Sequence, residues 1–292
     1  MILKLKSDEV SGAVDTYGGE LVSFVKNGVE YVWQGNPEYW NGKAPILFPV
    51  VCAAKDNVMS HDGVDYPMPK HGIARRNEFE PVYISKDRIK VEQRATEESL
   101  KKYPFYYVLT ADHSISDKGF STVFSVKNYD KKEMTFCIGG HPGFNVPMAP
   151  EDGEFEDYSI YFEDTDGAVV SITKDSYMDD SVPKLDILKG KNKLPLRYSD
   201  YDRDALIIEN LPVKSVKLVS EKTGHGIRFG FEGFNVLGIW TPMHKKAPFI
   251  CLEPWNGLPA NVSETTDAKS KKYALTLAPG EEYAVGYNVE II

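Results

Sequence analysis

Apolar and polar residues alternate over most of the chain, and this period of two predicts β-strands. Successive side chains of a strand point to opposite faces, so the alternate apolar residues cover one face of a sheet. Turn residues interrupt the pattern about every eight to twelve residues, as in a sandwich or barrel and unlike β–α–β units. The clearest predicted strands are at 21–25, 29–33, 105–109, 120–126, 134–138, 227–231, 273–277 and 283–291.

We therefore expect an all-β fold, a large antiparallel β-sandwich formed by a single domain over residues 1–292. Asn27-Gly28, between two apolar runs, is the strongest hairpin signal in the first third of the chain. Helical pattern is confined to 96–102 and 199–204, enough for one or two turns each. No linker or repeat of fixed period divides the chain. The polar segments 148–156 and 173–193 are predicted to be long loops.

The segment 249–259 contains the most distinctive candidate residue. Its apolar first part predicts a strand that leads directly to Glu253, and we expect Pro254 to end the strand because proline has no N–H to donate. A carboxylate beside such a strand is costly to desolvate unless it is paired or used. Trp255 and Asn256 follow Glu253 and Pro254. An aromatic ring can stack on the C–H face of a sugar, and an amide and a carboxylate can hydrogen-bond its hydroxyl groups. A solvated Glu253 at a strand end is the alternative.

Two of the six histidines are also candidates. His141 directly follows a predicted strand, and the glycines around it allow a ligand or another backbone to come close. His71 lies between strands, also next to a glycine. An imidazole acid and a carboxylate base, His141 and Glu253, form the simplest catalytic pair. The other four histidines lie in polar turns or on alternating strands, and most are predicted to be solvated: His61, His113, His225 and His244.

Motifs for other chemistry are weak or missing. His71, His141 and Glu253 could form a metal site, because two histidines and a carboxylate hold non-haem iron in other proteins. However, no two of these residues have a His-x-His or His-x₃-His spacing. The glycines before His141 lack the lysine and the helix of a phosphate-binding loop, and there is no Gly-x-Ser-x-Gly segment. We therefore expect no cofactor and no metal.

Composition narrows the class of protein. The 292 residues carry a net charge of −9, which makes nucleic acid and anionic membranes poor partners. No apolar segment is long enough to span a bilayer, and the start of the chain lacks a secretory pattern. The three cysteines lie in apolar runs and have no metal-binding spacing: Cys52, Cys137 and Cys251. We expect them to be buried, reduced thiols. We expect a cytoplasmic protein with a small-molecule partner, and its oligomeric state stays open.

Four motifs in order resemble the aldose 1-epimerase (galactose mutarotase) family, in particular its bacterial LacX-like branch. They are His-Gly-Ile-Ala-Arg at 71–75, Ile-Gly-Gly-His-Pro-Gly-Phe-Asn at 138–145, Asp-Ala-Leu-Ile at 204–207 and Cys-Leu-Glu-Pro-Trp at 251–255. The similarity extends from Gly-Gly-Glu-Leu at 18–21 to Leu-Ala-Pro-Gly at 277–280. Each motif alone is weak, whereas four in this order are specific.

The resemblance implies an antiparallel β-supersandwich that exchanges the α and β anomers of a free aldose. It implies that His141 is the general acid at the ring oxygen and that Glu253 is the base at the anomeric hydroxyl. His71, Arg75 and Asp204 would bind the substrate, in addition to the aromatic surface of Trp255. Many relatives have Gly-Arg where this chain has Cys-Ala at 52–53, so one arginine contact is missing and the identity of the sugar stays open.

Three other functions compete with this interpretation. A hexose-phosphate mutarotase could use the positive cluster of Lys70, Arg75 and Arg76, although such charges can simply solvate a turn. A glycosidase needs two carboxylates around the scissile bond, and the chain has no second carboxylate in so distinctive a context. A non-catalytic carbohydrate-binding protein could stack a sugar on Trp240 or Trp255, but it would need no acid–base pair.

Overall fold

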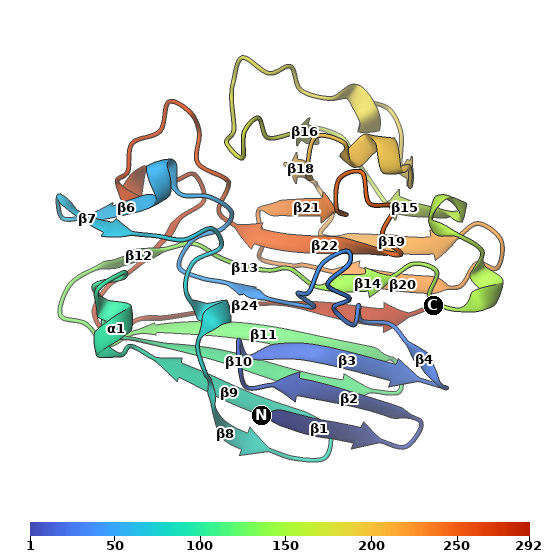
Figure 1. Ribbon diagram of the computed structural model, residues 1–292, viewed down its shortest axis with the longest axis horizontal. Helices are drawn as coiled ribbons and strands as arrows, with labels where there is room; N and C mark the ends of the chain where they lie inside the picture. Colours follow the sequence, from blue (N-terminus) through green and yellow to red (C-terminus); the bar gives the residue numbers. More distant parts are fainter.

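Antiparallel strands form nearly all of the regular structure in the computed structural model, which describes residues 1–292 (Figure 1). The predicted all-β fold is confirmed. Its largest sheet has nine strands in the order β17-β15-β19-β20-β24-β11-β10-β9-β8. These strands are β8 (Glu80–Ile84), β9 (Arg88–Arg94), β10 (Tyr107–Ser116), β11 (Gly119–Asn128), β15 (Tyr158–Phe162), β17 (Lys193–Pro195), β19 (Ser215–Ser220), β20 (Gly226–Gly230) and β24 (Glu282–Ile291).

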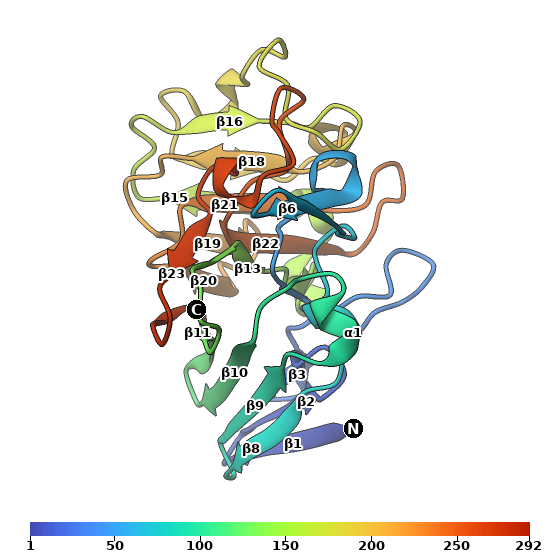
Figure 2. The ribbon, with the colours of Figure 1, turned by 90° about the vertical axis from the view of Figure 1, so that its left-hand side faces the viewer.

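A second large sheet has seven strands, in the order β16-β18-β21-β22-β13-β5, with β14 also paired to β22. The views in Figures 1 and 2 show β22 in the interior of the molecule, beside β21. The strands of this sheet are β5 (Ile46–Leu47), β13 (Ile138–Gly140), β14 (Gly143–Asn145), β16 (Val169–Ser171), β18 (Leu206–Glu209), β21 (Val236–Trp240) and β22 (Phe249–Asn256).

Three smaller sheets complete the fold. The N-terminal sheet β1-β2-β3-β4 lies beside β9 and β10 in both views (Figures 1 and 2). Its strands are β1 (Ile2–Ser7), β2 (Val10–Asp15), β3 (Glu20–Lys26) and β4 (Val29–Glu30); the two-stranded sheets pair β6 (Val58–His61) with β7 (Val64–Pro67) and β12 (Met134–Phe136) with β23 (Leu275–Leu277).

Helices are short, as the sequence predicts. The α-helix α1 (Glu97–Leu100) begins after Thr96, whose side chain accepts a hydrogen bond from the Ser99 N–H and caps the first turn. None of the helices has the length and apolar character needed to cross a membrane. The 3₁₀ turns are η1 (Lys55–Asn57), η2 (Ala74–Arg76), η3 (Pro150–Asp152), η4 (Phe155–Asp157), η5 (Asp186–Leu188), η6 (Tyr198–Tyr201) and η7 (Ala268–Ser270).

Alternation along the strands builds the core. On β19, Val216, Leu218 and Ser220 are buried and the residues between them are partly exposed. The main hydrophobic cluster contains 61 buried residues, from Leu5 to Val289. Each large aliphatic or aromatic side chain buried in this way stabilises the fold by about 1.5–3 kcal/mol. The alternation that predicts the strands is therefore the pattern that encloses the core.

Strand β22 departs from this alternation because all eight of its residues are buried. The predicted strand end at Pro254 is wrong, since the strand continues to Asn256. The Leu252 N–H donates to the Pro142 carbonyl at 3.2 Å. Backbone nitrogens two residues apart point to the same side of a strand, so the Pro254 nitrogen faces the same side as that of Leu252. On that side β22 pairs with β13 and then with β14, and the hydrogen-bond ladder is interrupted at the link between these two strands. A proline is tolerated there, and Glu253 lies inside the strand.

The histidine prediction is also wrong for two residues. His113 is buried, and its ring nitrogens contact the Thr122 hydroxyl and the Gly19 carbonyl at 2.9 Å each. His61 is buried edge-on against Phe105. Both histidines occupy inward positions of a strand, where a polar side chain that finds partners or an aromatic surface can replace an apolar one.

Glycine positions in the sheet make room for Trp255. A Cβ atom at Gly238 would lie 2.6 Å from the six-membered ring of Trp255, and one at Gly139 would lie 2.7 Å from its Cδ1. These glycines belong to β21 and β13, the two neighbours of β22. The indole therefore lies against backbone on both sides of its own strand.

We expect Gly238→Ala to lower the free energy of unfolding by about 1–3 kcal/mol, because the added methyl overpacks the indole. Urea unfolding of wild type, Gly238→Ala, Trp255→Phe and the double variant measures the coupling between the two positions. The alanine should cost less beside the smaller phenylalanine ring. Strictly additive effects would contradict this packing account.

Candidate active site

A cavity of about 460 Å³ lies over the middle of β22. It is lined by side chains from β21, β22, the link between β13 and β14, the segment before β8 and the loops after β16 and η6. The structure brings to this one cavity every residue that the sequence analysis singles out for catalysis or substrate binding: His71, Arg75, His141, Asp204, Glu253 and Trp255.

Glu253 lies at the bottom of this site with only 2% of its surface exposed. Because residues two apart share a strand face, Glu253 lies between Cys251 and Trp255, which belong to two separate small apolar clusters. Burial raises the pKa of the Glu253 carboxyl well above its usual value, and the negative charge of Asp204 raises it further. The carboxyl is thus held in a dry environment that favours its protonated form.

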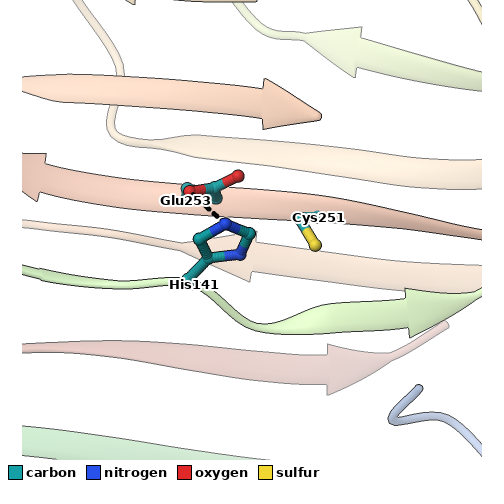
Figure 3. Close-up of side chains that lie close together, drawn as sticks. All are labelled: His141, Cys251 and Glu253. Atoms are coloured by element: carbon teal, nitrogen blue, oxygen red, sulfur yellow. Dashed lines mark ion pairs between the residues drawn. The ribbon is translucent and has the colours of Figure 1, made fainter. Parts of the chain in front are cut away.

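His141 faces Glu253 from the link between β13 and β14 (Figure 3). Its Nε2 is 3.2 Å from a carboxylate oxygen of Glu253, and its backbone N–H donates to the Pro45 carbonyl at 3.1 Å. Burial lowers the pKa of His141 to about 3, which favours the neutral imidazole. The pair therefore holds one proton, which the 3.2 Å contact places within reach of both groups.

Aromatic rings fix the orientation of the His141 imidazole. Trp40 stacks on it with ring centroids 4.8 Å apart, and Trp240 meets it edge-on at 5.5 Å. Trp40 is absent from the sequence-based prediction. The one sequence feature that points to Trp40 is the Asn-Gly pair at 41–42 that follows it. In the structure Gly42 packs on the Trp40 indole, and a Cβ atom at Gly42 would come within 2.3 Å of the ring.

His71 is a neutral hydrogen-bond donor. The Cys52 N–H donates to its Nδ1 at 3.2 Å, and burial lowers the pKa of His71 well below its usual value. Because Nδ1 accepts, the ring proton is on Nε2, which has no acceptor in the protein. The backbone of Cys52 therefore orients His71.

Arg75, Asp204 and Trp255 differ in how they meet the cavity. Arg75 makes no ion pair; one of its terminal nitrogens donates to the Lys70 carbonyl at 3.3 Å, and its Nε is buried without a partner. Asp204 accepts a 3.4 Å hydrogen bond from the Thr173 hydroxyl. Trp255 is 1% exposed, so its ring is almost wholly covered, whereas Trp240 is more exposed at the cavity.

Comparison with known proteins matches this architecture to one family. The sequence model described as aldose 1-epimerase matches residues 1–290. The chain belongs to the aldose 1-epimerase family. Its relatives include the chromosomal and plasmid forms of Protein LacX from Lactococcus lactis subsp. lactis, each 32% identical over 303 residues, with both chains covered completely.

Solved structures agree with this family membership. A galactose mutarotase-like protein from Lactobacillus casei is 31% identical, with a TM-score of 0.92 and full coverage of both chains. A galactose mutarotase related enzyme from Lactobacillus acidophilus is 27% identical, with a TM-score of 0.94 over 100% of this chain and 97% of that one. A putative aldose 1-epimerase from Escherichia coli, at 15% identity and a TM-score of 0.77, shares the fold. The family supports a general sugar epimerase or mutarotase role.

Glu20 supports this aldose 1-epimerase-like site from outside the cavity. It lies at the start of β3 and accepts a 3.0 Å hydrogen bond from the Ala44 N–H. Ala44 belongs to the segment that carries Trp40, so the contact ties that segment to the N-terminal sheet. Burial raises the pKa of Glu20 from 4.5 to about 7, and the positive charge of Arg75 opposes this rise.

We expect stability to fall as the pH rises from about 4.5 to about 7, because folded Glu20 keeps its proton in this range and unfolded Glu20 loses it. The loss should be about 1–3 kcal/mol. Glu20→Gln should flatten this part of the stability curve, since glutamine does not titrate. Urea unfolding at pH 5.0 and 7.5, with the exposed Glu9→Gln as the control, measures the difference. An unchanged slope in Glu20→Gln would contradict the assignment.

Proposed function

We propose that this protein is an aldose 1-epimerase that interconverts the α and β anomers of a free aldose, with His141 and Glu253 as its proton-transfer pair. The observation that carries the proposal is the 3.2 Å contact between His141 Nε2 and the Glu253 carboxylate at the bottom of a cavity. The ring oxygen and the anomeric hydroxyl oxygen of an aldose are both bonded to C1. Groups that serve these two oxygens must therefore lie close together, as these two do.

The reaction balances with these two groups alone. His141 gives a proton to the ring oxygen while Glu253 takes the proton of the anomeric hydroxyl, and the bond between C1 and the ring oxygen breaks. The open-chain aldehyde turns about its C1–C2 bond, and the reverse transfers close the ring on the other face of the carbonyl. The protein regains its original protonation, so each turnover leaves it unchanged.

The one proton of the pair is available for this cycle at neutral pH. Burial favours this proton on Glu253, and the direct contact is the path by which it reaches His141. The opposite assignment, with Glu253 as the acid and His141 as the base, uses the same proton and the same atoms. Family resemblance favours His141 at the ring oxygen.

The remaining residues would hold the sugar. His71 offers an Nε2–H donor, Arg75 offers N–H groups without an ionic partner, and Asp204 offers carboxylate oxygens to hydroxyl groups. Trp240 would supply most of the apolar surface for the C–H face of the sugar ring, because the ring of Trp255 is almost wholly covered. These roles are complementary, because the polar groups meet hydroxyls and the Trp240 indole meets carbon.

A hexose phosphate is the second candidate substrate, favoured by three cations at the cavity. Lys70, Arg75 and Lys245 all line it, and none of them makes an ion pair with the protein. The carboxylate of Asp204 lines the same cavity and would repel a phosphate. We favour the free sugar for this reason.

We expect His141→Asn and Glu253→Gln each to slow anomer exchange by about 10²–10⁴-fold, because each removes one proton-transfer partner. Saturation transfer between the two anomeric proton signals of galactose measures the exchange rate at equilibrium. The exposed-site variants His244→Asn and Glu97→Gln are the matched controls. A folded His141→Asn or Glu253→Gln with near-full activity would overturn the assignment.

Arg75→Ala distinguishes the two substrate classes. If Arg75 binds a neutral hydroxyl, kcat/KM should fall moderately for galactose and for glucose 6-phosphate alike, with little effect of salt. Arg76→Ala is the control, because Arg76 is exposed and does not line the cavity. A larger loss confined to glucose 6-phosphate, together with a wild-type kcat/KM for this ester that falls with salt, would instead identify a phosphate site.

A further inference from the structure

A thiol lies beside the His141–Glu253 pair, and the proposed reaction does not use it. A ring nitrogen of His141, the sulfur of Cys251 and a carboxylate oxygen of Glu253 all lie within 4.8 Å of one another (Figure 3). All three side chains are buried. Cys251 and Glu253 are two residues apart on β22 and share one face, and His141 approaches that face from the link between β13 and β14.

The donor set suits a thiophilic divalent ion. Thiolate, imidazole and carboxylate are the three ligand types that bind Zn²⁺ in proteins, at about 2.0–2.3 Å. Closure of the three donors around one ion requires shifts of about 1 Å from the present positions. The cavity beside His141 and Glu253 leaves a fourth position open, as in zinc sites with three protein ligands.

A second observation points to an unfilled ligand position. The Nδ1 atom of His141 is buried and has no hydrogen-bond partner, although the residue is only 7% exposed. Buried polar atoms are nearly always satisfied, so this nitrogen is an exception that a ligand from outside the protein would explain. One nitrogen of His141 meets Glu253, so the imidazole has coordination capacity that the protein itself does not use.

We infer that His141, Cys251 and Glu253 form a binding site for Zn²⁺ or a similar thiophilic ion, and that the ion excludes the sugar. Bound Zn²⁺ takes up a ring nitrogen of His141 and a carboxylate oxygen of Glu253, so the pair no longer exchanges its proton and the reaction is inhibited. This inhibition rests on the proposed function, whereas metal binding itself does not.

Metal binding at this site releases protons. Burial and the neighbouring Glu253 raise the pKa of the Cys251 thiol well above its usual value, so the thiol carries its proton in the metal-free protein. Zn²⁺ displaces this proton and the one proton of the His141–Glu253 pair, and two protons leave to solvent. Mg²⁺, which prefers oxygen ligands and near-ideal octahedral geometry, does not fit this donor set.

Titration of the metal-free full-length protein with Co²⁺ tests the site without any activity measurement. One equivalent of Co²⁺ should give a thiolate-to-cobalt charge-transfer absorption, which Zn²⁺ removes and Mg²⁺ leaves unchanged. Cys251→Ala should abolish the absorption and weaken Zn²⁺ binding by at least about 10–100-fold, the effect that loss of an outer partner alone can have. Cys137→Ala and Cys52→Ala are the controls, since these free cysteines lie outside the cluster.

If the alanine variant is unstable, Cys251→Ser serves as a second variant, because serine removes the thiolate and nearly keeps the side-chain volume. In wild type, Zn²⁺ should raise KM for galactose with little change in kcat, and EDTA should reverse the effect. Wild-type protein without a charge-transfer absorption would overturn the proposal. An absorption that persists in both Cys251 variants, or that is lost in Cys52→Ala, would overturn it as well. A protein that binds Co²⁺ through Cys251 but exchanges no anomers would refute the proposed function and leave the metal site intact.

Discussion

The buried contact between His141 and Glu253 is the interaction on which the rest of the site depends. A carboxyl in a wholly buried strand is costly as an anion, and an imidazole beside it can share its proton. Burial leaves the pair with one proton, and the 3.2 Å contact lets the two groups share it. An exposed pair would have ordinary pKa values and separate hydration shells, and the coupling between them would be weak.

Backbone packing holds this contact in place. Glycines on the two strands that flank β22 let Trp255 lie flat against the sheet, and the β13–β14 link carries His141 over Glu253. Trp40 then covers the imidazole from a segment that Glu20 ties to the N-terminal sheet. Residues far apart in the sequence therefore fix one ring. This convergence also brings Cys251 beside the pair, where a thiol changes which ions the cavity can bind.

Sequence reasoning predicted the fold well because strand alternation and core burial are the same pattern. It also brought His71, Arg75, His141, Asp204 and Glu253 into view through local motifs, and these residues do meet in one cavity. The rest depends on strand pairing, which a local motif does not contain. Whether Pro254 ends β22 depends on the ladder opposite it. The burial of His113 depends on Gly19, and the positions of Trp40 and Cys251 at His141 depend on register between distant strands.

The most direct measurement of the central claim is polarimetry of freshly dissolved α-galactose, α-glucose and α-glucose 6-phosphate with and without the protein. A buried acid–base pair that turns sugar over should speed the approach to anomeric equilibrium in proportion to protein concentration and leave the final rotation unchanged. We expect this acceleration for at least one free aldose. A rate equal to that of the buffer for all three sugars, with saturable sugar binding by the same protein, would contradict it and identify a carbohydrate-binding protein without turnover.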